Sequence, residues 1–204
     1  ITRAIGQELQ EEVDVCVYGG TSAGVIAAYT AAKLGKSVLL IEPGKHLGGL
    51  TAGGLGYTDI GNKYVVTGLS RDFYRRIGTH YGKFEQWIFE PHVAENIFKQ
   101  YIRAANITVW YDHRIVSAVK DDGVIQRIVL ESTINPSAAT NREVRARMFI
   151  DCSYEGDLMA RAGVSYFYGR EANSLHNETY NGFQLLDKHQ FADGVDPYKV
   201  KGNP

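Results

Sequence analysis

Cysteine is scarce in this sequence, which has only Cys16 and Cys152 among its 204 residues. Two cysteines so far apart exclude a small scaffold held by many disulfides, and neither lies in the paired spacing of a cysteine metal site. Long apolar runs are also absent, since no stretch approaches the roughly 20 apolar residues that a membrane-spanning helix needs. No basic start followed by an apolar segment indicates an intact signal peptide. The sequence therefore predicts no metal site and no membrane span.

An excess of charge of either sign is lacking as well. The 22 Lys and Arg residues nearly balance the 23 Asp and Glu residues, giving a formal net charge of -1. Without a global field or a run of basic residues, nothing would draw the chain to nucleic acid or to an anionic membrane. We expect no nucleic-acid partner, whereas the oligomeric state and the cellular location stay open.

The sequence does have the composition of a globular protein, with 44% hydrophobic and 22% charged residues. That is enough apolar material for a sizeable core. The chain starts at Ile1 without Met and stops abruptly at Pro204. We expect that residues were removed before Ile1 and that the protein continues beyond Pro204.

The first part of the chain has the pattern of a strand, a helix and a second strand. Residues 13–18 are an apolar, Val-rich run that suits a buried parallel strand. Residues 23–34 are rich in Ala and are followed by Gly35, where the glycine that ends a helix belongs. Residues 37–41 form another apolar run, so the three segments together span the roughly 30 residues of a βαβ unit.

Later segments complete a predicted α/β fold. Residues 44–61 are dense in glycine and predict a long functional loop. Amphipathic patterns predict helices at 69–81 and 91–105, within a helical insert at about residues 61–105. Short apolar runs predict strands at 107–110, 115–119, 124–130 and 144–150, with residues 121–123 as a hairpin turn. We predict a Rossmann-like parallel sheet with an inserted β-meander at about residues 115–131.

The strongest local signal is the loop between the first strand and the helix, which consists of Gly19, Gly20, Thr21, Ser22, Ala23 and Gly24. Small residues let the backbone approach a pyrophosphate, and the helix N-terminus supplies N–H donors and partial positive charge. Thr21 occupies the position of the middle glycine, which is tolerable if the loop stands back or if the hydroxyl binds a phosphate oxygen. The alternative is a glycine turn that merely joins strand to helix.

Glu42 follows the second strand and is placed to accept hydrogen bonds from an adenosine ribose. Its charge disfavours NADP, because a carboxylate would repel a 2′-phosphate. A second glycine-rich segment, residues 46–56, comes directly afterwards. Two glycine pairs so near the first loop suggest backbone running tightly along a long ligand, which favours FAD over NAD. A flexible surface loop is the alternative.

Four stretches together resemble a known family: residues 17–24, 46–56, 89–95 and 151–158. They look like the bacterial FAD-dependent oxidoreductase family sometimes labelled xanthan-lyase-like, and the resemblance covers nearly the whole chain. The last two stretches are the more discriminating, because the phosphate loop is shared with many nucleotide-binding folds. A threonine after the first glycine pair is common in that family.

The resemblance implies a glutathione-reductase-like FAD domain followed by a separate substrate domain. Gly19, Gly24 and Glu42 would hold the pyrophosphate and ribose, and the backbone at Val116 would meet the adenine. The turn after the last core strand would return the chain to the flavin through Asp151, Cys152 and Gly156. Further cofactor contacts are expected at Pro43, His46, Gly48, Gly49, Leu50, Thr51, Gly53 and Gly54.

Several polar side chains in these stretches have a second interpretation. Asp151, Glu155 and Asp157 are candidate catalytic carboxylates or metal ligands, but acids at this position more often cap the following helix. His46 is either a polar loop residue near the cofactor or a proton donor or covalent attachment point for the flavin. No catalytic residue is assigned.

The two cysteines have different expected roles. Cys16 lies within an apolar strand and should be inert core. Cys152 is either a reactive thiol near the flavin or a small buried residue that fills a tight turn.

The leading hypothesis for function is an FAD-dependent oxidoreductase that transfers a hydride between the flavin and a small organic substrate. Residues 1–170 would form the FAD-binding domain, and residues 171–204 would begin a truncated substrate domain. One alternative is an NAD-dependent dehydrogenase that uses only the first βαβ unit. Another is a nucleotide-binding or carbohydrate-associated module without redox turnover. The sequence does not identify the substrate.

Overall fold

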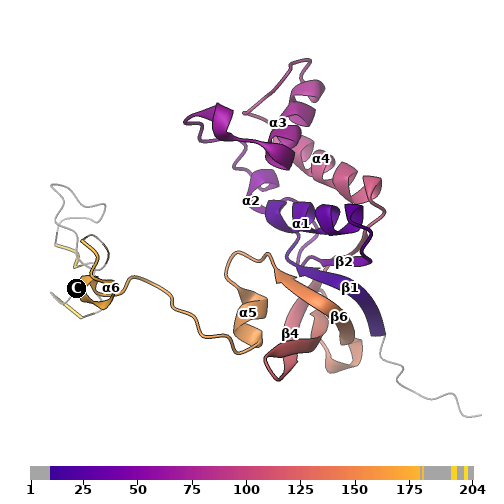
Figure 1. The fold of residues 1–204 in the computed structure, drawn as a ribbon, viewed down its shortest axis with the longest axis vertical. Helices are drawn as coiled ribbons and strands as arrows, with labels where there is room; N and C mark the ends of the chain where they lie inside the picture. The colour runs from indigo at the N-terminus through magenta and orange to yellow at the C-terminus, as the bar shows by residue number, and fades with distance from the viewer. Residues whose placement is uncertain (1–9, 180, 182–193, 197–199, 202–204) are drawn as a thin grey trace, which may run out of the picture. The chain divides into compact units, whose positions relative to one another are not determined.

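Six strands form one sheet, in the order β3-β2-β1-β6-β5-β4, in the computed structural model of the chain (Figure 1). The structure describes residues 10–179, 181, 194–196 and 200–201. These residues belong to two units, Ile1–Val164 and Ser165–Pro204, each of which is described by itself. The sheet lies in the first unit.

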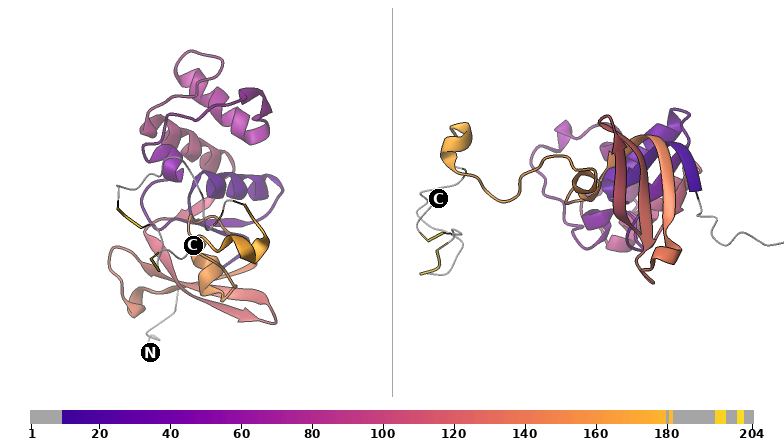
Figure 2. Two further views of the ribbon diagram at one scale, coloured as in Figure 1. Left: turned by 90° about the vertical axis from the view of Figure 1, so that its left-hand side faces the viewer. Right: turned by 90° about the horizontal axis from the view of Figure 1, so that it is seen from below.

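The strands follow the predicted pattern closely. The pairs β1–β2, β2–β3 and β1–β6 are parallel, whereas β4–β5 and β5–β6 are antiparallel. The mostly parallel sheet confirms the predicted α/β fold, and Figure 2 shows its strands side by side. The strand bounds are β1 (Gln10–Tyr18), β2 (Val38–Ile41), β3 (Thr108–Trp110), β4 (His113–Asp121), β5 (Val124–Ser132) and β6 (Arg142–Asp151).

Helices fill the connections between strands. Both amphipathic helices begin and end within one residue of their predicted bounds, and Gly35 after α1 has a φ of 79° in the left-handed region, as a terminating glycine requires. The helices are α1 (Ser22–Lys33), α2 (Gly49–Ala52), α3 (Gly68–His80), α4 (Pro91–Ala104), α5 (Asp157–Arg161) and α6 (Asn173–His176), with 3₁₀ turns η1 (Lys63–Val65) and η2 (Ala138–Thr140).

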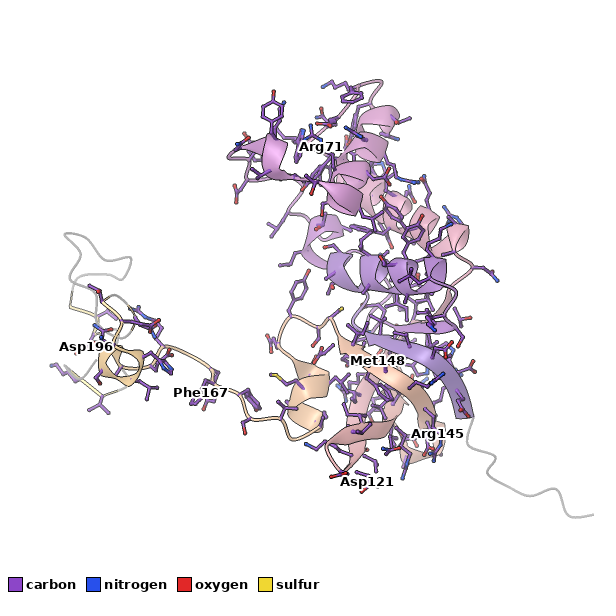
Figure 3. The ribbon with its side chains drawn as sticks, in the orientation of Figure 1. Arg71, Asp121, Arg145, Met148, Phe167 and Asp196 are labelled. Carbon is purple, nitrogen blue, oxygen red and sulfur yellow. The ribbon has the colours of Figure 1, made fainter. Side chains whose placement is uncertain are left out.

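One feature differs from the sequence-based expectation: the segment 44–61 is not loop throughout, because residues 49–52 form α2. The inserted β-meander is confirmed, since β4 and β5 pair antiparallel and β5 continues onto β6, which is also the fourth parallel strand. The predicted hairpin turn is confirmed: Asp122 and Gly123 have φ values of 45° and 78°, as a type I′ turn needs (Figure 3 labels Asp121 beside it).

The core lies on both faces of the sheet. On one face, Val15 and Val17 of β1 pack in one core cluster with residues of α1, α3 and α4. On the other face, Cys16 and Tyr18 pack with residues of β4, β5 and α5. This alternation follows from the opposite directions of successive strand side chains. The faces of the sheet are thus covered by helices and strand side chains, whereas loops cover the carboxyl ends of the parallel strands.

The region before α3 is tied down by Arg71 (Figure 3). Its guanidinium donates to both carboxylate oxygens of Glu85, at 2.7 and 3.1 Å, and to the main-chain oxygens of Lys63 and Val66. The hydrogen bond from Arg71 lowers the pKa of Glu85; burial opposes this effect, and a hydrogen bond from Arg75 lowers the pKa further. This cluster fixes the 3₁₀ turn η1 against α3.

The second unit contains α6. Residues 182–193 of this unit lie outside the described residues. The predicted start of a substrate domain at residue 171 therefore stays a prediction.

Candidate functional site

Three loops meet at the carboxyl ends of β1, β2 and β6. They are residues 19–22 after β1, residues 42–49 after β2 and residues 152–156 after β6. Because these strands are parallel neighbours, their carboxyl ends share one edge of the sheet, which is the usual ligand position in such folds. Most sequence-predicted site residues belong to these loops or to the helices that begin there. Asp151 is the last residue of β6, Gly53 and Gly54 directly follow α2, and Val116 lies on β4.

The first loop is packed too closely to accept side chains at two glycines. Gly19 has a φ of 99°, and a Cβ there would lie 2.7 Å from the carbonyl carbon of Cys152. A Cβ on Gly24 would overlap the main-chain oxygen of Gly19. The backbone of Gly19 is held in place by its N–H, which donates to the oxygen of Ile41 at 2.8 Å. This loop is a fixed cradle rather than a flexible connection.

Thr21 faces the protein instead of the open side of the loop. Its hydroxyl donates to the oxygen of Cys152 at 2.9 Å and accepts from the N–H of Gly24 at 3.2 Å, which caps α1. The residue is 7% exposed. The idea that this hydroxyl binds a phosphate oxygen therefore does not fit the structure. The threonine is tolerated because its side chain points inward, leaving the first N–H groups of α1, on Ser22 and Ala23, without intrahelical acceptors.

Glu42 links the first two loops. One carboxylate oxygen accepts from the N–H of Gly20 at 2.8 Å, and the other accepts from the N–H of Gly44 at 2.6 Å. Each oxygen has lone-pair capacity left for a further donor. The side chain is therefore oriented by the backbone before any ligand arrives. The adjoining carbonyl of Pro43 accepts from the hydroxyl of Thr133 at 3.0 Å, which fastens this loop to the end of β5.

The second glycine-rich segment is bonded to the first loop. The N–H of Gly48 donates to the oxygen of Gly20 at 2.8 Å, and the hydroxyls of Ser22 and Thr51 lie 3.0 Å apart. Gly48 and Gly49 both have positive φ values, 102° and 52°. A flexible surface loop is thus the wrong interpretation for residues 48–51. Gly53 ends α2, and Gly54, with a φ of 125°, has open space where a Cβ would stand.

Tyr154 closes the arrangement and was not singled out from the sequence. Its hydroxyl accepts from the N–H of Leu50 at 2.6 Å, and a Cβ on Gly49 would overlap that hydroxyl. The phenol thereby ties the third loop to the first turn of α2. Only its place in the stretch 151–158 pointed toward it, because the contact joins residues 104 positions apart.

The third loop is ordered by Asp151. Its carboxylate accepts from the N–H and hydroxyl of Ser153, at 3.0 and 2.6 Å, and from the N–H of Met159 at 2.9 Å. This is the capping role expected for an acid before α5, and it leaves the carboxylate engaged with the protein. Gly156, with a φ of 70°, precedes the first residue of α5.

The two cysteine thiols are both poor nucleophiles in this structure. Burial raises the pKa of Cys16 to about 12, which agrees with an inert core residue. Burial, followed by the charge of Asp151, also raises the pKa of Cys152. The arrangement therefore favours a structural role for Cys152 over an activated thiol.

Two predicted residues differ from the others in their surroundings: His46 contacts α4, and Val116 lies on β4. The imidazole of His46 is 81% exposed and its Nδ1 lies 3.2 Å from a carboxylate oxygen of Glu95 on α4. Burial raises the pKa of Glu95, but hydrogen bonds from Lys99 and His46 outweigh this effect and lower the pKa overall. Val116 lies where the β4–β5 register shifts, which leaves its backbone outside the regular ladder.

Among the described residues, no three His, Cys, Asp or Glu side chains gather as a metal site would require. In the same part of the chain, every helix is too short or too polar to cross a membrane.

Comparisons with known proteins bear on what this site binds. Residues 14–201 match the family described as FAD dependent oxidoreductase. Thiamine thiazole synthase from Pyrococcus horikoshii is 26% identical over 174 residues, which cover 79% of this chain and 67% of that protein. The enzyme of the same name from Pyrococcus abyssi is 28% identical over 159 residues, which cover 74% of this chain and 60% of that protein.

Solved structures show the same fold. A geranylgeranyl bacteriochlorophyll reductase-like protein from Thermoplasma acidophilum aligns with a TM-score of 0.55 and 21% identity, over 76% of this chain and 43% of that one. THI4 from Thermovibrio ammonificans aligns with a TM-score of 0.53 and 22% identity, over 76% of this chain and 64% of that one. The chain thus spans less than two thirds of these solved relatives.

The family match decides between the cofactors considered from the sequence. It confirms FAD, and it confirms an FAD-dependent oxidoreductase as the class of enzyme. Since the match runs from residue 14 to residue 201, this chain belongs to the FAD-dependent oxidoreductase family.

Proposed function

We propose that the three joined loops hold FAD in an extended conformation along the carboxyl edge of the sheet. The N–H groups of Ser22 and Ala23 at the start of α1 suit the pyrophosphate, because they are free of intrahelical acceptors and lie at the positive end of the helix. The carboxylate of Glu42 suits the adenosine ribose. Its two backbone hydrogen bonds fix it in a position from which it would repel a 2′-phosphate.

The remaining parts of FAD have matching backbone. The shifted register at Val116 offers main-chain groups for the adenine. Residues 48–54 carry four of the glycines, so backbone rather than bulky side chains would line the ribityl chain and the isoalloxazine ring. Leu50 and Thr51 lie in this stretch, while Cys152, Asp151 and Gly156 form the loop opposite it. The close packing around Gly19 and Gly24 agrees with a cradle for a dinucleotide.

The activity that we propose is hydride transfer between the flavin and a small organic substrate. FAD supplies the redox chemistry when it is bound, and the protein contributes position and electrostatics. The observation that carries this proposal is the hydrogen bond between Gly48 and Gly20, since it makes the two glycine segments one continuous platform. An NAD domain that used only the first βαβ unit would have no use for the second segment.

The domain roles and the narrower family relation are part of the same proposal. Residues 1–170 would form the FAD-binding domain, and residues 171–204 would begin a substrate domain. The branch labelled xanthan-lyase-like is proposed from the stretches 89–95 and 151–158.

The test is the visible absorption spectrum of the purified full-length protein, followed by release and identification of any yellow chromophore. Bound FAD that dithionite reduces and air or an added acceptor reoxidises would support the proposal. A protein that binds FAD but holds it in a form that cannot be reduced would favour the module without redox turnover. A colourless protein that rejects added FAD and binds NAD would overturn the proposal.

A further inference from the structure

A cavity of 310 Å³ lies among α1, α2, α3 and α4, beside the candidate cofactor site. Its mouth is between α1 and α3, where Ala23 and Ser70 are exposed. Ser22, Ala23 and Thr51 in its lining are also proposed FAD contacts. The rest of the lining, which is Ile26, Leu69, Ser70, Phe73, Tyr74 and Phe98, has no part in the proposed FAD site. Its walls show what kind of molecule would fit.

One wall of the cavity is aromatic and rigid. Phe73 and Phe98 stack with ring centres 4.8 Å apart and planes 19° apart, and Tyr74 meets Phe73 edge to face at 5.3 Å. Phe73 and Phe98 are 6% and 2% exposed, so the surrounding core holds both rings in place. Flat apolar surfaces of this kind favour contact with another ring.

Hydroxyl groups also line the cavity. They belong to Ser22, Thr51 and Ser70, and the first two are 3.0 Å apart. A hydroxyl that makes one hydrogen bond can still donate or accept another. None of the described residues that line the cavity carries a charged side chain at neutral pH. With the N–H groups of Ser22 and Ala23 assigned to the pyrophosphate, a carboxylate in the cavity would lose hydration without gaining an ion pair, which is unfavourable.

The cavity and the second glycine segment are parts of one packed unit. A Cβ on Gly48 would overlap the ring of Phe98, so the glycine backbone rests directly on the aromatic wall. Ser22 and Thr51, which join the two glycine segments, are also cavity residues. A molecule in the cavity would consequently lie next to the part of the loop to which we assign the flavin side of the cofactor.

The volume sets the size of the occupant. An apolar cavity of roughly 150 Å³ holds one benzene ring, so 310 Å³ has room for one ring with a substituent. We propose that this cavity binds the uncharged ring portion of the substrate, an aromatic or alicyclic ring bearing a hydroxyl or carbonyl group. This inference rests on the proposed function and adds the substrate class to it.

The test uses the FAD-loaded full-length protein and two ring probes of similar size. The neutral probe is p-cresol and the charged probe is 4-methylbenzoate. Binding is measured by calorimetry and by the shift of the flavin absorption bands. We expect saturable binding of p-cresol with a shifted flavin spectrum, and binding of 4-methylbenzoate at least tenfold weaker.

Variants locate the bound probe. Ser70→Phe narrows the mouth of the cavity and should weaken p-cresol binding at least tenfold while FAD binding is retained. Thr79→Phe adds the same ring to α3 outside the cavity and serves as the matched control, with no change expected. Leu69→Phe narrows the cavity from the neighbouring lining position and replaces the first variant if that one does not fold.

Three results would overturn this inference: no p-cresol binding, equal binding of both probes, or wild-type affinity in the narrowed variants. Competition between p-cresol and FAD would also overturn it, because the cavity would then belong to the flavin. These failures leave the proposed function standing as long as the protein binds and reduces FAD. Failure to bind FAD at all would instead refute the proposed function.

Discussion

The hydroxyl of Thr21 donates a hydrogen bond of 2.9 Å to the main-chain oxygen of Cys152, across 131 residues of sequence. The same hydroxyl accepts from the N–H of Gly24 and so caps α1. One side chain thus joins the loop after β1 to the loop after β6 and starts the helix between β1 and β2. Two neighbouring parallel strands are fixed at the edge where we place the cofactor.

Replacing Thr21 by Val tests the contribution of the two hydrogen bonds of the hydroxyl separately from that of side-chain packing, because Val keeps the shape and loses the hydroxyl. We expect Thr21→Val to lower the free energy of unfolding by about 1 to 2 kcal/mol, since it removes a helix cap and leaves a buried carbonyl unpaired. Urea unfolding of the FAD-free protein measures this change. Thr21→Ser keeps the hydroxyl and should lose much less. A larger loss in Thr21→Ser than in Thr21→Val would show that the methyl group, not the hydroxyl, matters.

Glu42→Gln tests the ribose contact. The amide keeps one acceptor oxygen but replaces the other with a donor, so it cannot accept from both Gly20 and Gly44. We expect FAD affinity to fall by roughly tenfold or more, the usual effect of losing a hydrogen bond to a charged group. Flavin fluorescence during titration of the FAD-free protein gives the dissociation constant.

The control for this experiment is Glu12→Gln. Glu12 is an exposed carboxylate near the start of β1, at the end of the strand opposite the three loops. Its loss should leave FAD affinity unchanged. If both variants bind FAD as the wild type does, Glu42 orders the loop but does not contact the cofactor.

The parts of this molecule that sequence predicts well are those governed by local patterns. The apolar run of β1, the glycines at 19 and 24 and the terminating Gly35 are all readable from neighbours in the chain. The Asp122–Gly123 turn is readable for the same reason, since both residues tolerate positive φ.

The parts that sequence missed depend on contacts between distant segments. The hydroxyl direction of Thr21 is set by Cys152, and α2 starts where Tyr154 accepts from Leu50. In both contacts the two residues are far apart in sequence, so no periodicity or spacing in the sequence predicts that they meet. His46 had several possible roles for the same reason, because its hydrogen-bond partner Glu95 is on α4. FAD contacts at each predicted residue stay predictions until a bound complex is measured.

Tyr154→Phe tests whether the third loop helps to retain the cofactor. The variant keeps the ring but removes the acceptor for the N–H of Leu50, so the link between the third loop and α2 is broken. We expect FAD to dissociate faster, by roughly three- to tenfold, in line with the loss of one hydrogen bond. The change in flavin fluorescence after rapid dilution of the FAD-loaded protein gives the rate.

Tyr57→Phe is the matched control for this variant. Tyr57 is 75% exposed and lies outside the three loops. A dissociation rate that rises equally in both variants would assign the effect to general surface changes. An unchanged rate in Tyr154→Phe would show that this link does not retain FAD.

The reactivity of the two thiols should follow their burial. The thiolate is the reactive form, and burial raises the pKa of Cys152 above its ordinary value of 9.0 and that of Cys16 to about 12. Iodoacetamide should therefore label both residues more slowly than a free thiol at pH 8. Cys152, which is partly exposed, should react before Cys16, which is fully buried. Mass spectrometry of tryptic peptides distinguishes the two sites.

The direction in which the stability of the protein changes with pH follows from the raised pKa values of the two thiols. The folded protein holds both thiol protons more tightly than the unfolded chain does, so the stability that they contribute is present below about pH 9. That contribution is lost as the pH rises through the higher native values, and labelling accelerates over the same range. FAD should slow labelling of Cys152, since its main chain forms the loop opposite the glycine platform, and should leave Cys16 unaffected. Labelling of Cys152 at pH 7 faster than a free thiol would instead identify an activated nucleophile, and a structural role for this residue would be wrong.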